Sequence, residues 1–235
     1  MPRLFRVLTT ALAFSSLAGC GATSGGAADS ASAEPSAASP AANAPGQPPA
    51  GPDPRVAAAD AARIKGDVNA TLWIVVVSDF QCPFCGQWER ETAAQVVKEF
   101  VEPGIARLAF VNYPLRQHPN ALPAAEAAMC AGAQGKFWEM HNRIFETQAE
   151  WSLLPSGDAF FESAAVAVGV SAPAYQACIA DHVMRPMIEA DVERATAGGA
   201  RSTPTFFIGN QVMSGAEKIE AFRAAVAQAR SALPK

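Results

Sequence analysis

The sequence predicts an α/β fold built from a βαβ unit, a helical insertion and a ββα unit. Three observations predict this fold. A continuous apolar run at 72–77 is followed, from Pro83, by apolar residues at helical spacing. No convincing strand follows between about 115 and 200, and strand character returns at 205–208 ahead of a final helical pattern. The helical stretch is therefore interpreted as an insertion into a strand-containing scaffold.

The βαβ unit comes first. Residues 72–77 are rich in β-branched side chains, which is typical of a buried strand. Helical spacing extends from Pro83 to about Val101, and Pro103-Gly104 predicts a turn. Residues 105–112 alternate between apolar and polar or small side chains, which predicts a second strand. Strand, helix and strand in this order predict parallel strands with a right-handed connection.

The insertion, from about 115 to 200, is too long to be a structureless loop in a compact protein. After it, 205–208 and 211–213 predict two strands joined by a tight turn at Gly209-Asn210. The last helix is expected from Ala216 to about Ser231, which completes the ββα unit. Further helices are expected at 56–64, 123–133, 137–145, 158–168, 173–181 and 183–197.

The N-terminus has the features of an export signal. Arg3 and Arg6 precede a mostly apolar stretch that is too short to span a bilayer. Leu17-Ala18-Gly19-Cys20 resembles the lipobox of bacterial lipoproteins, in which the cysteine is lipidated and becomes the mature N-terminus. Residues 1–19 are therefore interpreted as a lipoprotein signal peptide and Cys20 as the lipidation site. An ordinary signal peptide with an incidental cysteine is the alternative.

The segment 20–55 is rich in Ala, Ser, Gly and Pro and has almost no large apolar side chain. Such a composition cannot offset the entropy of ordering, so we expect a disordered tether. The tether would let the folded part, residues 56–235, reach away from its anchor. We expect the protein in the cell envelope, periplasmic or otherwise extracytoplasmic, attached to a membrane by lipid alone.

Charge narrows the classes of partner. The chain has 18 basic and 22 acidic residues, and removal of Arg3 and Arg6 with the signal peptide lowers the net charge by two, from −4 to −6. No basic cluster is found along the chain. These features argue against a nucleic-acid partner and against electrostatic docking to an anionic membrane.

The motif that indicates a reactive site is Cys82-Pro83-Phe84-Cys85, at the junction between the first strand and the helix that follows it. Pro83 suits the first helical turn, because its missing N–H would have no intrahelical partner there. Cys82 then stands at the helix N-terminus, where unpaired N–H groups and the dipole stabilise a thiolate. Cys85 is one turn deeper and can close a ring with it. The alternative is a structural or zinc-binding pair, although zinc usually takes four ligands and no second close pair of Cys or His follows.

The pattern as a whole resembles the thioredoxin fold in its DsbA-like form, from about Asp67 to the C-terminus. The resemblance implies a thiol:disulfide oxidoreductase with Cys82 and Cys85 as the catalytic pair and no cofactor or metal. It also implies a cis peptide bond between Thr203 and Pro204, facing the cysteines, where an extended substrate binds through backbone hydrogen bonds. The motifs that carry the resemblance are Asp79-Phe80-Gln81-Cys82-Pro83-Phe84-Cys85, Gln134-Gly135-Lys136-Phe137-Trp138 and Ser202-Thr203-Pro204-Thr205-Phe206-Phe207-Ile208-Gly209.

Two positions depart from the family pattern. The best-known members have histidine in place of Phe84, and without that positive charge we expect a less oxidising pair. Many relatives have a buried acid in place of Val76 that assists proton transfer. Asp79 or Glu89 could replace this acid only if the fold brings one of them near Cys85.

Four further residues are candidates of lower specificity. Cys130 and Cys178 are both expected on helices of the insertion, and two cysteines in one exported subdomain favour a structural disulfide over free thiols. Some relatives have a second disulfide in this subdomain. His118 and His141 are expected to be a turn residue and a packed helix residue, with no catalytic role.

The leading hypothesis is an exported, lipid-anchored thiol:disulfide oxidoreductase, monomeric, that oxidises cysteines of secreted proteins. Its expected partners are exported polypeptides with free thiols or disulfides, and a membrane redox partner that reoxidises or reduces the pair. A reductase or isomerase would use the same residues. Two competing hypotheses are a module that binds Cu(I) through Cys82 and Cys85, and a binding lipoprotein in which the pair is a structural disulfide.

Overall fold

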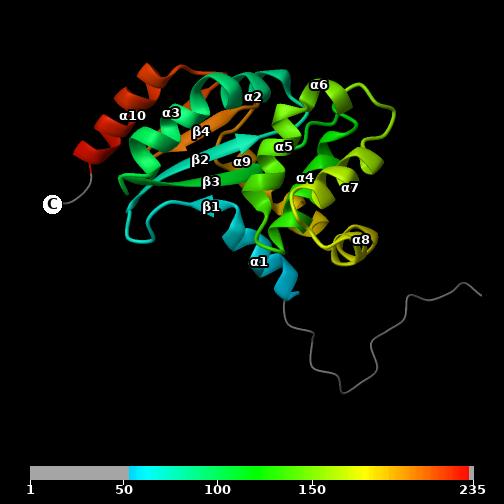
Figure 1. The fold of residues 1–235 in the computed structure, drawn as a ribbon. Coiled ribbons are helices and arrows are strands. Elements are labelled where there is room, and N and C mark those ends of the chain that lie inside the picture. The colour runs from blue at the N-terminus through cyan, green and yellow to red at the C-terminus, as the bar shows by residue number, and fades with distance from the viewer. Residues whose placement is uncertain (1–52, 233–235) are drawn as a thin grey trace, which may run out of the picture. The chain divides into compact units, whose positions relative to one another are not determined.

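The computed structural model describes residues 53–232 (Figure 1). The expected signal peptide, the lipidation site Cys20 and most of the expected tether lie outside these residues. In chain order the elements are α1 (Pro54–Ala62), β1 (Ile64–Lys65), β2 (Leu72–Ser78), α2 (Pro83–Trp88), a π-helical turn (Glu89–Ala93), α3 (Ala94–Val96), a second π-helical turn (Val97–Val101), β3 (Ala106–Asn112), α4 (Ala121–Gly132), α5 (Phe137–Glu146), α6 (Gln148–Trp151), α7 (Asp158–Ala167), α8 (Ala172–Ala180), α9 (Arg185–Ala197), β4 (Thr205–Ile208), β5 (Gln211–Ser214) and α10 (Ile219–Ser231).

The strands form one five-stranded sheet in the order β1-β3-β2-β4-β5. β2 and β3 are parallel, with Leu72 opposite Ala106 and Ser78 opposite Asn112. β4 lies antiparallel between β2 and β5. The sheet thus combines strands that precede the insertion with strands that follow it, and the predicted α/β fold is confirmed.

The first helix begins slightly earlier than the sequence predicts. We expect a helix over 56–64, whereas α1 spans Pro54–Ala62. Its start is fixed by Asp53, whose side chain accepts a hydrogen bond from the Arg55 N–H at 2.8 Å. Helix α1 therefore includes residues that we expect in the tether.

The edge strand β1 is not predicted. Its two residues, Ile64 and Lys65, pair antiparallel with β3, and the Phe110 N–H donates to the Arg63 carbonyl at 3.1 Å. A strand of two residues is too short to show any periodicity, so only the neighbouring strand reveals it.

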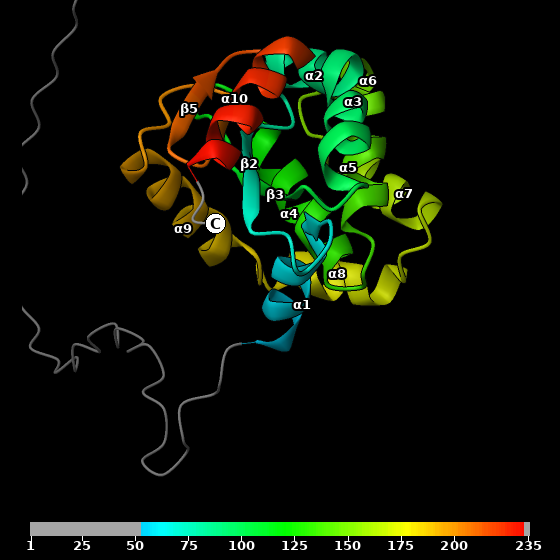
Figure 2. The ribbon, with the colours of Figure 1, turned by 90° about the vertical axis from the view of Figure 1, so that its left-hand side faces the viewer.

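Helices cover both faces of the sheet. Leu72, Ile74 and Val76 of β2 lie in one core with Trp88 and Phe222, because α2, α3 and α10 pack on that face (Figure 1). On the other face, Val77 packs with Ala195 of α9 and with Phe207. Figure 2 shows α9 set apart from the layer formed by α2, α3 and α10. Helix α2, which begins directly after Cys82, is therefore held by a buried apolar face.

The insertion is built around α4, which packs against α1, α5, α7 and α8. Nearly every side chain of α4 is buried, since these helices surround it. The short helix α6 is not predicted, and it reaches the start of α2. No helix within residues 53–232 is long and apolar enough to cross a membrane.

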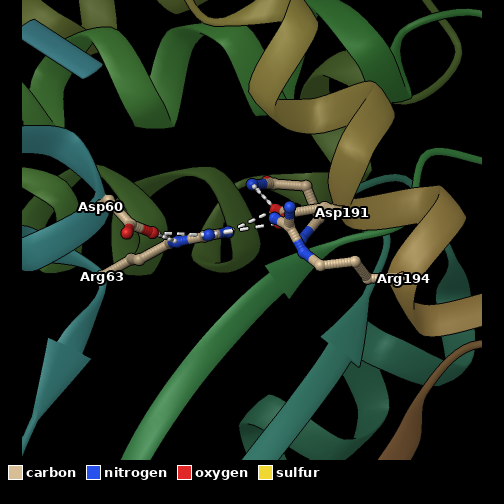
Figure 3. Close-up of polar contacts among 5 residues, drawn as sticks. Asp60, Arg63, Asp191 and Arg194 are labelled. Atoms are coloured by element: carbon tan, nitrogen blue, oxygen red, sulfur yellow. Dashed lines mark hydrogen bonds and ion pairs between the residues drawn. The ribbon is translucent and has the colours of Figure 1, made fainter. Parts of the chain in front are cut away.

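An ionic cluster around the buried pair Arg63 and Asp191 joins the insertion to the sheet (Figure 3). The Arg63 guanidinium contacts Asp191 of α9 and donates to Asp60 at 2.6 Å. Asp191 also accepts from Arg194 at 2.7 Å and from the backbone N–H of Asn112 at 3.2 Å. Asp191 is 1% exposed, so its charge is balanced by paired groups and not by water. This cluster fixes α9, and α9 leads directly into the loop that contains Pro204.

Candidate active site

The two cysteines of the motif lie at the start of α2. Cys82 is the N-cap, with φ −67° and ψ 124°, and Pro83 follows within the first helical turn. The Cys82 N–H donates to the Asp79 carbonyl at 3.1 Å, which closes the turn between β2 and α2. Both thiols are free, and Cys82 is 4% exposed whereas Cys85 is fully buried at 0%. An attacking group therefore meets the Cys82 sulfur first.

The surroundings of Cys82 favour its thiolate. Its pKa is lowered from 9.0 to about 6, chiefly because the Cys85 thiol donates a hydrogen bond to it, while burial opposes the shift. Thr203 and the backbone N–H groups of Cys85 and Phe84 lower the pKa further. The sequence predicts the contribution of the helix terminus, but the partner thiol is the larger cause.

Cys85 is held in the opposite state. Burial raises its pKa well above the usual 9.0, and its hydrogen bond and charge interaction with Cys82 raise it further. The Asp79 N–H and the Ser78 hydroxyl act in the opposite direction without reversing the shift. The pair therefore has one sulfur that ionises near neutral pH and one that keeps its proton.

The loop before β4 places Thr203 and Pro204 against Cys82. The Thr203–Pro204 peptide bond is cis, and the Cys82 thiol donates to the Thr203 carbonyl with a sulfur–oxygen distance of 3.4 Å. The two residues that the family resemblance implies for substrate binding thus lie beside the more exposed cysteine.

Asp79 lies at the turn between β2 and α2 and is fully occupied by hydrogen bonds. Its carboxylate accepts from the Gln81 N–H at 2.7 Å, the Leu115 N–H at 2.9 Å and the His118 Nδ1 at 2.7 Å. Burial nevertheless raises its pKa. Asp79 contacts Cys85 through its backbone N–H, so the carboxylate itself serves to hold the loop at 115–118 against the motif.

Glu89, the second acid considered, is paired with His141 at 3.2 Å between Oε1 and Nε2. His141 is 2% exposed and stacks edge-on against Phe80 and Phe110. Both residues line a cavity of about 460 Å³, which Lys65 also lines. The two histidines expected to have no catalytic role thus pair with the two acids that could replace the missing one.

The two departures from the family pattern are seen directly. Phe84 is 60% exposed between the cysteines and brings no charge to them. Val76 is 2% exposed in the core and leaves no acid at this position of the strand. The thiolate of Cys82 is therefore stabilised by hydrogen-bond donors and not by a neighbouring cation.

Two amide side chains near the motif have no role predicted from the sequence. Gln148 of α6 donates to the carbonyl groups of Phe80 at 2.7 Å and Cys82 at 2.9 Å. Gln81 donates to the Ser152 carbonyl at 2.6 Å and accepts from the Asn120 N–H at 2.7 Å. The one sequence feature that could have indicated their role is that these polar residues lie next to apolar runs. This feature is common in turns, so it does not identify a functional residue.

The other two cysteines of the described chain are bonded to each other. Cys130 of α4 and Cys178 of α8 form a disulfide, with a Cα–Cα distance of 5.8 Å. Both are almost fully buried in the core of the insertion. This bond therefore links two helices of the insertion and is separate from the Cys82 and Cys85 thiols.

Metal ligation is the competing hypothesis for the motif. Within residues 53–232, no group of three or more His, Cys, Asp or Glu side chains is placed to hold a metal ion. Cys82 and Cys85 together offer two sulfur ligands.

Comparison with known families gives one family model that matches, Thioredoxin_4, described as thioredoxin, over residues 59–228. Among curated proteins, the Na(+)/H(+) antiporter NhaA 1 of Salinispora arenicola is 34% identical over 171 residues, which cover 72% of this chain and 25% of the antiporter. The chain thus spans about a quarter of the length of this relative. The probable disulfide bond formation protein D of Bacillus anthracis is 29% identical over 84 residues, covering 35% of this chain and 39% of that protein.

Among solved structures, the chain resembles alpha-DsbA1 of Wolbachia pipientis, with a TM-score of 0.64 and 19% identity over 72% of this chain and 90% of that one. It also resembles oxidised BdbD of Bacillus subtilis, with a TM-score of 0.65 and 17% identity over 72% of this chain and 92% of that one. At this level of identity the likeness shows the fold, which is the DsbA-like form of the thioredoxin fold.

Proposed function

The chain belongs to the thioredoxin family, and we propose that it is an exported, lipid-anchored thiol:disulfide oxidoreductase. It acts on cysteines of secreted proteins through Cys82 and Cys85. The observation that supports this proposal best is the opposite protonation of the two thiols, with the pKa of Cys82 lowered to about 6 and that of Cys85 raised. A structural disulfide needs no such difference, whereas an exchange reaction does.

The exchange follows from the geometry. In the oxidised chain, a substrate thiolate attacks the Cys82 sulfur, the Cys82–Cys85 bond breaks, and its electron pair leaves on Cys85, which takes up a proton. A second substrate thiolate then attacks the substrate sulfur of the mixed disulfide and releases Cys82 as a thiolate. The substrate gains a disulfide and loses two electrons, and the enzyme holds them as a dithiol.

The position of Thr203 supports the same assignment. Its carbonyl lies 3.4 Å from the Cys82 sulfur, so a polypeptide that extends along this loop brings its own sulfur to Cys82. Backbone hydrogen bonds give affinity without requiring a particular sequence. Thr203 and Pro204 are therefore proposed as the substrate-binding residues.

The cellular setting is proposed from the sequence. Cys20 carries the lipid, the segment 20–55 forms the tether, and the folded part works at the extracytoplasmic side of the cell envelope. A membrane redox partner restores the disulfide after each turnover. Cys130 and Cys178 form a structural disulfide in this oxidising compartment.

The test of the function is turnover of a reduced, unfolded protein that contains two cysteines. The oxidised wild type should introduce the disulfide, and Cys82→Ser should not. Cys85→Ser, given a protein that already contains a disulfide, should instead trap a mixed disulfide. The Cys82 thiolate attacks the substrate disulfide, one substrate sulfur leaves as a thiolate, and the Cys85 sulfur that would resolve the new bond is missing. Full oxidation activity in Cys82→Ser would contradict the proposal.

The direction of electron flow is measured separately. A reductase or isomerase would use the same residues, and Phe84 leaves the thiolate without the extra cation that favours strong oxidation. Equilibration of Cys82 and Cys85 with glutathione gives the potential. If the pair is largely reduced at the glutathione potential of the oxidising compartment, it readily accepts electrons from substrates and acts as an oxidase. If the pair stays oxidised at that potential, its dithiol form is the stronger reductant.

A further inference from the structure

We propose that Gln148 is a positioning residue for the exchange reaction, because its side-chain amide fixes the carbonyl groups that flank the start of α2. The inference rests on the proposed function and concerns the same site. Gln148 touches neither substrate nor a reacting sulfur in the observed contacts. It acts through the backbone of Cys82.

The hydrogen bonds of Gln148 are directional. Its Nε2 donates to the Phe80 carbonyl at 2.7 Å and to the Cys82 carbonyl at 2.9 Å. Carbonyl oxygens accept hydrogen bonds and cannot donate them, so the amide nitrogen of Gln148 must face the two carbonyl groups. Gln148 is 8% exposed. A buried carbonyl group that lacks a hydrogen bond lowers the stability of the fold. One side chain therefore holds both ends of the three-residue turn that precedes the helix.

Gln148 is itself held rigidly by the insertion. It begins α6, directly after Thr147, whose hydroxyl donates to the Arg143 carbonyl at 2.7 Å. Trp151, at the end of α6, is fully buried and donates its indole N–H to the Ile144 carbonyl at 2.9 Å. Because both neighbouring contacts lead back to α5, the amide is carried on an ordered element and not on a free loop.

Gly86 is shaped to receive this amide. A Cβ placed at Gly86 would lie 2.3 Å from the Gln148 Oε1 and 2.9 Å from its Cδ. Alanine in the interior of a helix is normally more stable than glycine. Glycine immediately after Cys85 therefore has a reason beyond helix propensity, since it leaves room for Gln148 against the active-site turn.

The contacts of Gln148 affect the thiolate through the orientation of the backbone N–H groups of Phe84 and Cys85. The Cys82 carbonyl also accepts from the Gly86 N–H at 3.1 Å, so Gln148 and the helix share one anchoring oxygen. The backbone N–H groups of Phe84 and Cys85 stabilise the Cys82 thiolate only while this first turn keeps its orientation. Fixing the turn before reaction means that no reorganisation is needed when charge develops on sulfur.

The chain offers a matched control in Asn120. Its side chain donates to the Leu154 carbonyl at 2.9 Å and accepts from the Gly157 N–H at 2.9 Å, so it also ties buried loops together. None of these side-chain bonds reaches the carbonyls of Phe80 or Cys82. Loss of the Asn120 side chain should lower stability without changing the sulfur chemistry.

The experiment compares Gln148→Met, Asn120→Ala and the wild type in the reduced full-length chain. Gln148→Met keeps the length of the side chain but removes both N–H donors. We expect its Cys82 acid dissociation constant to fall about three- to tenfold, since one pKa unit corresponds to a tenfold change. The glutathione equilibrium should shift in the same sense, toward a less oxidising pair. Asn120→Ala should lower the melting temperature and leave both quantities at their wild-type values.

A double-mutant cycle provides the second readout. Gly86→Ala should weaken the Cys82 thiolate as Gln148→Met does, because the new methyl group displaces the amide. In a Gln148→Ala background, the same Gly86→Ala change should have almost no further effect, since the space is empty. The Gly86→Ala and Gln148→Ala variants also test the proposal if Gln148→Met folds poorly.

The outcomes separate the two proposals. Turnover by the wild type and its loss in Cys82→Ser test the function, whereas the thiolate titration of the Gln148 variants tests the positioning role and needs no substrate. Non-additive shifts in the cycle support the inference. Wild-type dissociation constants in both Gln148→Met and Gly86→Ala, or shifts as large in Asn120→Ala, overturn it.

Discussion

The two cysteine pairs of this chain place the same chemical group in contrasting surroundings. Cys82 and Cys85 are free thiols separated by two residues, at a helix start beside the loop of Thr203. Cys130 and Cys178 are bonded, 48 residues apart in sequence, between two helices of the insertion. The first pair has hydrogen-bond donors that stabilise a thiolate. The second pair is closed by a disulfide, which is why one pair is proposed as catalytic and the other as structural.

The sharpest test of this contrast is selective reduction. After oxidation and treatment with mild thiol under native conditions, alkylation should label Cys82 and leave Cys130 and Cys178 unlabelled. Their sulfurs should become reactive only after reduction in denaturant, because both residues are buried and bonded. Mass analysis of peptides gives the count. Labelling of Cys130 and Cys178 without any reduction would show that their bond does not form.

The second test removes the bond. Cys130→Ala combined with Cys178→Ala should lower the free energy of unfolding by about 2–4 kcal/mol, the range typical of a disulfide. The redox equilibrium of Cys82 and Cys85 should stay the same, because the hydrogen bonds that lower the Cys82 pKa come from other residues. Denaturant unfolding and a glutathione titration measure the two quantities. A large shift in the redox equilibrium would contradict the separation.

The third test uses pH. The pKa of Cys82 is about 6 in the folded chain and near 9.0 when unfolded, so the unfolded state binds more protons between these values. The reduced form should therefore gain stability as pH rises from about 6 toward 9, and lose it as pH falls through 6. The oxidised form, in which Cys82 cannot titrate, should lack this slope, and Cys130 and Cys178 should contribute none. Equal slopes for the two forms would be inconsistent with a stabilised thiolate.

The smallest expected effect comes from the exposed side chain between the cysteines. Phe84→His would place a partly protonated imidazole near the Cys82 sulfur, and we expect a several-fold more oxidising pair, since a lower thiol pKa makes a better leaving group. Phe84→Gln, which is polar but uncharged, is the control. If both variants shift the potential equally, charge is not the cause.

The architecture of the sheet could be predicted because each of its long strands has its own signal. The run at 72–77 and the alternation at 105–112 both mark strands that the structure contains, and the helical insertion follows from the absence of such patterns over the next eighty or so residues. β1 and α6 could not be predicted, for one shared reason. β1 has only two residues and α6 only about one helical turn, so neither shows a repeat of its period, and each forms because a neighbouring element provides its partners.

The site was predictable where chemistry is local. Cys82, Pro83 and Cys85 lie within four consecutive positions, so their placement at a helix start can be worked out from the motif alone. The role of Gln148 could not be, because its partners lie more than 60 residues earlier and its geometry depends on how the insertion docks. The pairing of His118 with Asp79 has the same origin. Such contacts between distant segments leave no spacing to detect.

The most direct measurement is a pH titration of the Cys82 thiol in the reduced wild-type chain. The ultraviolet absorbance of the thiolate monitors the ionisation, and Cys82→Ser is the reference. A single ionisation with a pKa near 6 that disappears in the variant is the predicted result. An ionisation at the value of an ordinary cysteine, near 9.0, would contradict the assignment of Cys82 as the reactive group.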